Sequence, residues 1–182
     1  MNPFRKIYCR TFQTVLKISI PFLPYRKPKI LGSVKALPEI LQKKKCGNVL
    51  VITDESIVRL GLTRRLEKAL AENGIACTVY DRTVANPTTA NVEEAANLYL
   101  ENGCDSIIGF GGGSSMDCAK AVGIRIAKPK KPLSKMKGIL KVHTRLPLLM
   151  AVPTTAGTGS ETTLAAVITD AGTRHKYAIN DF

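Results

Sequence analysis

The chain has 182 residues, of which 45% are hydrophobic and 23% charged, so it can bury one full core and is neither a disordered nor a fibrous protein. Its formal net charge is +13, and its basic residues concentrate in the N-terminal segment, at 43–45 and from Lys128 to Lys141, a stretch that we expect to be a solvated surface loop. Few aromatic residues lie among these lysines, so we expect no nucleic-acid partner.

Cysteine usage and hydropathy indicate the compartment. The five cysteines are widely spaced and include no Cys-x-x-Cys pair, which favours reduced thiols over a disulfide framework or a zinc site. Basic residues interrupt the first apolar stretch, so we expect no signal peptide, and no stretch approaches the ~20 apolar residues of a membrane span. We therefore expect a cytoplasmic protein without a membrane partner.

The first 28 residues are expected to form a unit of their own. Apolar residues within 1–20 recur at helical spacing with basic residues between them, which predicts an amphipathic helix. Packing on the rest of the protein or on a partner subunit is favoured over a membrane surface. Pro21, Pro24 and Pro28 then predict an extended linker, and residues 29–182 form the remaining domain.

Strand and helix patterns alternate through the domain. Residues 48–54 are apolar on both faces, which predicts a central, parallel strand. Alternation of this kind predicts an α/β fold with a parallel sheet and flanking helices. The other expected strands are 29–33, 75–81, 107–110 and 147–153, the expected helices are 34–45, 55–73 (broken or double) and 92–102, and a β-hairpin is expected around 170–172.

The central element of the sequence is the run from Ile107 to Asp117, in which a strand leads into three consecutive glycines and then into a helix from about Cys118. Glycines allow close approach of a ligand, and a helix start offers unpaired N–H groups, so the run favours a bound phosphate. The alternative is an ordinary turn in which Ser114 or Asp117 caps the helix. Neither the Gly-x-Gly-x-x-Gly fingerprint nor a P-loop is present.

Polar residues follow the other predicted strands as well. Asp54, Asn86 and the threonine-rich run 154–163 each come directly after a strand or turn, and ligands of parallel sheets bind beyond the carboxyl ends of the strands. An Asp in this position can accept hydrogen bonds from a ribose and would repel a 2′-phosphate, which favours NAD over NADP. The alternative role of Asp54 is the N-cap of the next helix.

Three motifs together carry a family resemblance. Gly-Gly-Gly-Ser-x-x-Asp-x-x-Lys at 111–120, Asn-Pro-Thr at 86–88 and Pro-Thr-Thr-Ala-Gly-Thr-Gly-Ser-Glu at 153–161 resemble the iron-containing (group III) alcohol dehydrogenases. The resemblance implies their Rossmann-like, dehydroquinate synthase-like N-terminal domain and covers about the first half of a family member. It implies that Gly112, Gly113 and Ser114 bind the pyrophosphate, that Asp54 binds the ribose, that Thr154, Thr155 and Thr158 line the cofactor, and that Asn86, Asp117 and Lys176 lie near it.

The resemblance also implies an NAD-dependent oxidoreductase that interconverts alcohols and aldehydes or ketones and forms a homo-oligomer at full length. The family's metal, usually iron, is held by one Asp and three His of a helical C-terminal domain that this chain lacks. His143 and His175 fall outside those motifs, so we expect neither metal ligands nor catalytic residues here and an inactive isolated chain. A glycerol dehydrogenase-like enzyme, a non-catalytic nucleotide-binding module and a salt-sensitive nucleic-acid binder remain alternatives.

Overall fold

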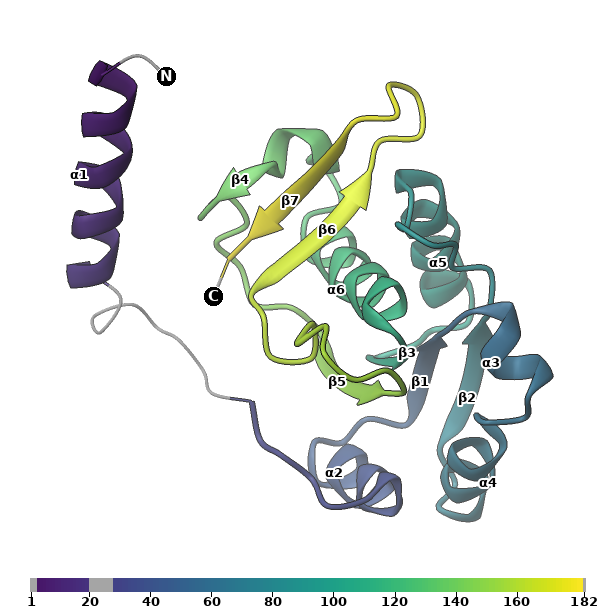
Figure 1. Ribbon diagram of the computed structural model, residues 1–182. Helices are drawn as coiled ribbons and strands as arrows, with labels where there is room; N and C mark the ends of the chain where they lie inside the picture. The colour runs from purple at the N-terminus through teal and green to yellow at the C-terminus, as the bar shows by residue number, and fades with distance from the viewer. Residues whose placement is uncertain (1–2, 20–27, 182) are drawn as a thin grey trace. The chain divides into compact units, whose positions relative to one another are not determined.

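The computed structural model describes residues 3–19 and 28–181, which divide into two units (Figure 1). One unit holds helix α1 (Pro3–Ser19), which forms where the periodicity predicts it. The other unit is Ile30–Asp181. The linker predicted around Pro21 and Pro24 lies outside the described residues. No helix in the described part of the chain is long and apolar enough to cross a membrane.

The larger unit is built on a sheet of four parallel strands in the order β2-β1-β3-β5. The chain moves outward in one direction from β1 to β2 and in the other from β3 to β5, so the winding reverses between β1 and β3. This is the topological switch point at which ligands of such sheets bind. All four strands were predicted; they are β1 (Asn48–Ile52), β2 (Ala76–Tyr80), β3 (Ser106–Gly111) and β5 (Leu148–Pro153).

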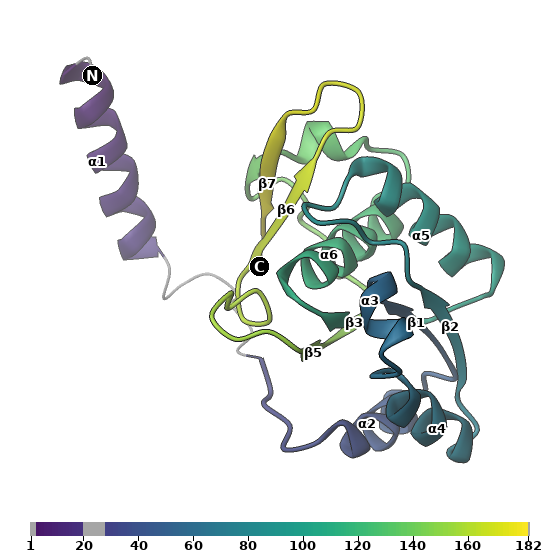
Figure 2. The ribbon, with the colours of Figure 1, turned by 45° about the vertical axis from the view of Figure 1, so that its right-hand side comes forward.

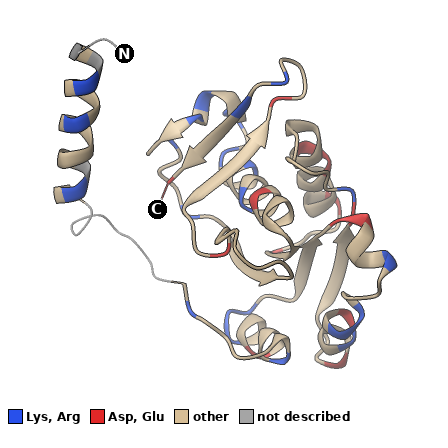
Figure 3. Cartoon of the chain, in the orientation of Figure 1, with Lys and Arg blue, Asp and Glu red and all other residues tan. Residues whose placement is uncertain are grey.

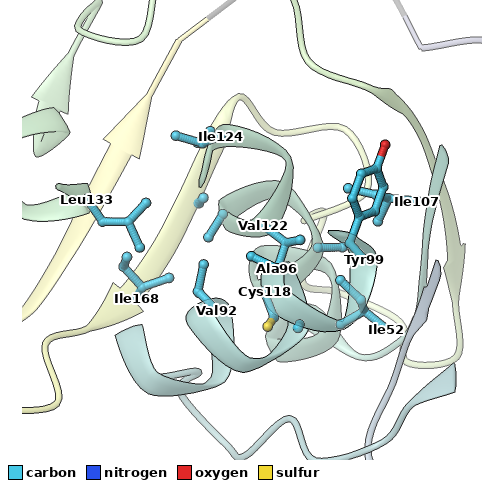
Figure 4. Packing of buried hydrophobic residues seen from close by; sticks show 14 of the residues in the cluster. Ile52, Val92, Ala96, Tyr99, Ile107, Cys118, Val122, Ile124, Leu133 and Ile168 are labelled. Carbon is cyan, nitrogen blue, oxygen red and sulfur yellow. The ribbon is translucent and has the colours of Figure 1, made fainter. Parts of the chain in front are cut away.

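Helices cover both faces of this sheet because strand residues point alternately to opposite sides. Leu50 and Ile52 of β1 belong to the core under α5 and α6, whereas Val49 and Val51 belong to the core under α2 and α4. Figure 4 shows the first of these clusters. The helices are η2 (Val34–Ala36), α2 (Leu37–Lys43), α3 (Glu55–Arg59), α4 (Arg64–Glu72), α5 (Thr89–Glu101), α6 (Gly113–Ala127) and η3 (Leu133–Met136).

Helix α6 lies between the parallel sheet and a second, smaller sheet (Figures 1 and 2). The second sheet has the order β4-β7-β6 and consists of β4 (Gly138–Ile139), β6 (Ala165–Thr169) and β7 (Lys176–Asn180). Its antiparallel pair β6–β7 is the predicted hairpin. On the other side, α6 approaches β3 so closely that a Cβ on Gly109 would lie 3.0 Å from the Cβ of Ala119.

Two local predictions were wrong. Residues 29–33 form no strand, because Ile30 is exposed and pairs with no strand among the described residues. The lysine-rich stretch 128–141 is not merely a solvated loop. Its lysines are mostly exposed, but Leu133 and Met136 of η3 are buried against the core of α6, and β4 pairs with β7.

Candidate functional site

The glycine turn sits at the switch point of the sheet, where β3 ends and α6 begins. Gly111 has φ +142°, and a Cβ there would lie 2.6 Å from Oγ of Ser115, so only glycine fits. Gly112 is the N-cap of α6, which begins at Gly113 rather than near Cys118, and no side chain caps the helix. Ser114 and Asp117 are therefore not capping residues, and no capping side chain occupies the first-turn N–H groups.

The threonine-rich loop after β5 lies against the other two glycines. The backbone N–H of Thr154 donates to the carbonyl of Gly111 at 2.9 Å. A Cβ on Gly112 would lie 3.2 Å from Oγ1 of Thr155, and one on Gly113 would lie 3.4 Å from Cβ of Thr158. Thr154, Thr155 and Thr158 are themselves exposed. The absence of side chains on Gly112 and Gly113 thus lets exposed hydroxyl groups approach the start of α6.

Asn86, Ser114 and Lys176 connect three separate elements beside this turn. The backbone N–H of Asn86 donates to Oγ of Ser114 at 3.2 Å, and Nζ of Lys176 donates to Oδ1 of Asn86 at 2.5 Å. Asn86 adopts φ +59°, a conformation that Asn tolerates better than most residues. The loop after β2, the first turn of α6 and the start of β7 therefore meet at one place, with the cation of Lys176 exposed there.

Asp54 stands at the end of β1 and caps α3, the role that the sequence offered as its alternative. Its Oδ1 accepts a hydrogen bond from the backbone N–H of Ile57 at 3.2 Å. Its Oδ2 lies 3.5 Å from where a Cβ on Gly111 would be, so the same carboxylate also faces the glycine turn. Beside it is an open hollow of about 450 Å³, lined by Glu55, Asp81, Arg82, Thr83 and Val84.

Asp117 and Lys120 form a half-buried network behind the threonine-rich loop. Asp117 accepts hydrogen bonds from Oγ of Ser160 and from the backbone N–H of Val167, at 2.5 and 3.2 Å. Nζ of Lys120 lies 3.3 Å from the same carboxylate and also donates to Ser160, to Thr163 and to the carbonyl of Ala165. Burial lowers the pKa of the Lys120 ammonium, and the charge of Asp117 opposes that shift.

Lys120 was not predicted to have a role, although its spacing from Asp117 was a usable signal. Asp117 and Lys120 are three residues apart, which places both on one face of a helix. The contacts of Asp117 described above run to α6, the end of the threonine-rich loop and β6, and they hold that loop from behind. The residues lining the hollow beside Asp54 were also not singled out, because they follow β2 without any recognisable motif.

The described residues offer no metal centre. Residues 3–19 and 28–181 contain no group of three or more His, Cys, Asp or Glu side chains able to hold a metal ion. His143 and His175 are both exposed. All five cysteines are free. The described residues thus do not fit the iron that the sequence resemblance implies, because that metal needs three or four convergent ligands.

The fold places the chain among the doubly wound α/β proteins, whose ligands bind outside the carboxyl ends of the strands. Within that class, the chain can be assigned to one family. Residues 30–182 match the family described as iron-containing alcohol dehydrogenase, and the chain belongs to it.

Relatives and solved structures agree with this assignment. The chain is 37% identical over 167 residues to "Probable alcohol dehydrogenase EutG" of Escherichia coli strain K12, covering 92% of this chain and 41% of that protein. A crystal structure of a 1,3-propanediol oxidoreductase superposes with a TM-score of 0.81 at 31% identity, over 87% of this chain and 42% of that one. Sulfoacetaldehyde reductase from Bifidobacterium kashiwanohense, solved in complex with NAD+, superposes with a TM-score of 0.73 at 27% identity, over 87% and 43%.

These matches all concern one part of the longer proteins. The chain spans about two fifths of the length of the relatives it matches. It corresponds to the N-terminal domain of the iron-containing alcohol dehydrogenases and consists of a four-stranded parallel sheet and a small mixed sheet with flanking helices.

Proposed function

We propose that residues 30–181 form the cofactor-binding part of an NAD-dependent oxidoreductase acting on small alcohols and aldehydes. The observation that carries the proposal is the meeting of an uncapped helix start with exposed threonine hydroxyls at the switch point of the sheet. Family membership supports it, as does the NAD+ complex of the sulfoacetaldehyde reductase. When bound, NAD supplies the carbon centre that accepts or returns a hydride.

The pyrophosphate would bind at the glycine turn. The N–H groups of Gly113 and Ser114 belong to the first turn of α6, where the positive end of the helix dipole favours an anion. The hydroxyl groups of Thr155 and Thr158 lie against the same turn and can donate to phosphate or amide oxygens. Lys176 adds an exposed cation beside the first turn of α6, held by Asn86.

Asp54 would determine the choice between NAD and NADP. Because Oδ1 is used by the cap of α3, Oδ2 is the oxygen that we assign to the ribose hydroxyls. A 2′-phosphate at the same place would meet a carboxylate, and the two anions would repel each other. The hollow lined by residues 81–84 is adjacent and is the position that we propose for the adenosine.

Asp117 has a different part in this proposal from the one that the resemblance suggests. Its two carboxylate oxygens accept bonds from Ser160 and Val167, and Lys120 lies beside them. We therefore propose that it holds the threonine-rich loop in place rather than contacting the cofactor.

We also propose that the 182-residue chain binds the cofactor without turning over alcohol. Polarising the oxygen of the alcohol is the task of the metal in a metal-dependent dehydrogenase. The described residues lack a group that could hold one. The homologous proteins are more than twice as long, so the ligands and the oligomer interface would belong to the part of those proteins that this chain does not match.

Calorimetric titration with NAD and with NADP tests the proposal. Asp54→Asn keeps an oxygen that can cap α3 but removes the charge, so the affinity for NADP relative to NAD should rise about tenfold, or about 1.4 kcal/mol. Glu101→Gln loses the same charge at the far end of α5 and should change neither affinity. Absence of saturable NAD binding would refute the site, and turnover by this chain with added iron would refute its inactivity.

A further inference from the structure

In helix α1 five exposed apolar residues gather on one face, and three of its four basic residues gather on the opposite face. Tyr8 and Phe12 are one turn apart, and their rings stack with centroids 6.5 Å apart. Ile7, Val15 and Ile18 fall within the same arc at 100° per residue. All five of these side chains are exposed, Phe12 by 43% and the others by 56% or more.

The opposite face of α1 is basic. Lys6, Arg10 and Lys17 recur at spacings of four and seven residues and fall on that face together with Gln13. Figure 3 shows Lys and Arg along this helix and no acidic residue. The first acidic residue of the whole sequence is Glu39, and the 38 residues before it carry eight basic residues, which account for eight of the thirteen net positive charges.

Contrary to the expectation from the sequence that this helix packs on protein, we propose that α1 binds the surface of an anionic lipid bilayer, lying in the plane of the headgroups. A bilayer provides a partner for both faces of the helix. The apolar arc would be buried at the boundary between headgroups and acyl chains, and the lysines and the arginine would contact lipid phosphates. Seventeen residues of strong amphipathic pattern with aromatic residues on the apolar side are typical of such interfacial helices.

Charge selects the bilayer over a second copy of this chain. Two α1 helices joined along their apolar arcs would form no interhelical ion pair, because neither contains an acidic residue, and both basic faces would stay unneutralised. An anionic membrane surface instead attracts each of these cations. The attraction depends on α1 alone and does not require the cofactor site to be formed.

Sedimentation of the full 182-residue chain with sucrose-loaded vesicles tests this assignment. The chain should bind vesicles of phosphatidylcholine mixed with phosphatidylglycerol and should bind pure phosphatidylcholine only weakly. Each basic residue at an anionic surface strengthens binding about fivefold, so Lys6→Gln/Lys17→Gln should weaken it about 25-fold. Lys44→Gln/Lys130→Gln removes two exposed charges from the larger unit and should weaken it about twofold or less.

A second pair of variants tests the apolar arc without altering charge. Ile7→Ser/Phe12→Ser should abolish binding to the mixed vesicles, whereas Gln13→Ser on the basic face should leave it unchanged. Equal losses from both charge pairs would assign the binding to the general basicity of the chain and overturn the proposal. So would retained binding by the Ile7/Phe12 variant or failure of the unaltered chain to bind.

Sedimentation velocity without lipid tests the alternative that a second copy of the chain covers the apolar arc of α1. The chain should sediment in the same association state whether or not Ile7 and Phe12 are replaced. The lipid assignment would be overturned if the unaltered chain failed to bind vesicles and formed a dimer that dissociates in Ile7→Ser/Phe12→Ser. The apolar arc would then be a dimer interface between two copies of the chain.

Discussion

Replacing Lys120 by methionine tests how the threonine-rich loop is held. Methionine keeps most of the unbranched side chain but removes the ammonium, which contacts Asp117, Ser160, Thr163 and Ala165. The side chains of Lys120 and Asp117 are only 13% and 16% exposed, so the remaining carboxylate would lose its counter-ion in a place that water reaches poorly. Breaking a fully buried pair in this way costs about 3–5 kcal/mol.

We expect about 3 kcal/mol for Lys120→Met, the low end of that range, because Asp117 keeps its bonds from Ser160 and Val167. With a urea m-value of about 2 kcal/mol/M, the midpoint of unfolding should fall by about 1.5 M. NAD affinity should fall as well, because the threonine-rich loop loses its anchor.

Two companion variants make the result interpretable. Lys43→Met breaks an ion pair that is shorter, at 2.6 Å, but whose side chains are 72% and 66% exposed, and it should cost no more than about 0.5 kcal/mol. Asp117→Asn/Lys120→Met removes the stranded charge and should be more stable than Lys120→Met alone. A loss below 1 kcal/mol with unchanged NAD affinity would refute the role of Lys120 as an anchor.

Three further predictions follow from local geometry. Gly111→Ala should cost about 3 kcal/mol in urea unfolding because of its φ and the contact with Ser115, whereas Gly74→Ala, with φ +68° and nothing within 4 Å, should cost about 1 kcal/mol; equal costs would contradict the steric argument. Burial raises the pKa of Cys118 to about 12, so the folded state holds the thiol proton more tightly than the unfolded state and stability falls as pH rises above about 9. Cys118→Ala should make that fall shallower by up to about 1.4 kcal/mol per pH unit, and an unchanged slope would disprove the assignment. Added Zn²⁺ should leave the thermal midpoint unchanged, since the described residues hold no metal cluster, and a rise would reveal one.

The sheet was predictable because each strand is marked by its own local sequence pattern. Four apolar runs bounded by turn residues gave β1, β2, β3 and β5, and alternation with helices gave their parallel direction. The start of α6 was placed too late because the helix begins with Gly113, Ser114 and Ser115, residue types of lower helix propensity than alanine. Tertiary contacts with the threonine-rich loop and β3 hold that turn in helical form, and local sequence does not encode such contacts.

The candidate site was predictable in position but not in detail. Topology alone brings Asp54, Asn86 and the glycine turn to one edge of the sheet. The sequence could not show that Asp54 divides its two oxygens between the cap of α3 and the glycine turn, because that depends on the side-chain rotamer. Nor could it show the contacts of Lys120, whose partners lie 40 to 45 residues away in Ser160 and Ala165.

The position of α6 between the two sheets has a consequence for how the site moves. Its residues from Ser115 to Ile124 are mostly buried, so its amide hydrogens should exchange with solvent only when the whole domain unfolds. The loop from Thr154 to Thr158 is exposed, so we expect it to open locally at a smaller cost, which includes the hydrogen bond from the N–H of Thr154 to the carbonyl of Gly111. We therefore expect α6 to keep one side of the candidate site as rigid as the core, and the facing loop to close on a ligand or release it without unfolding of the domain.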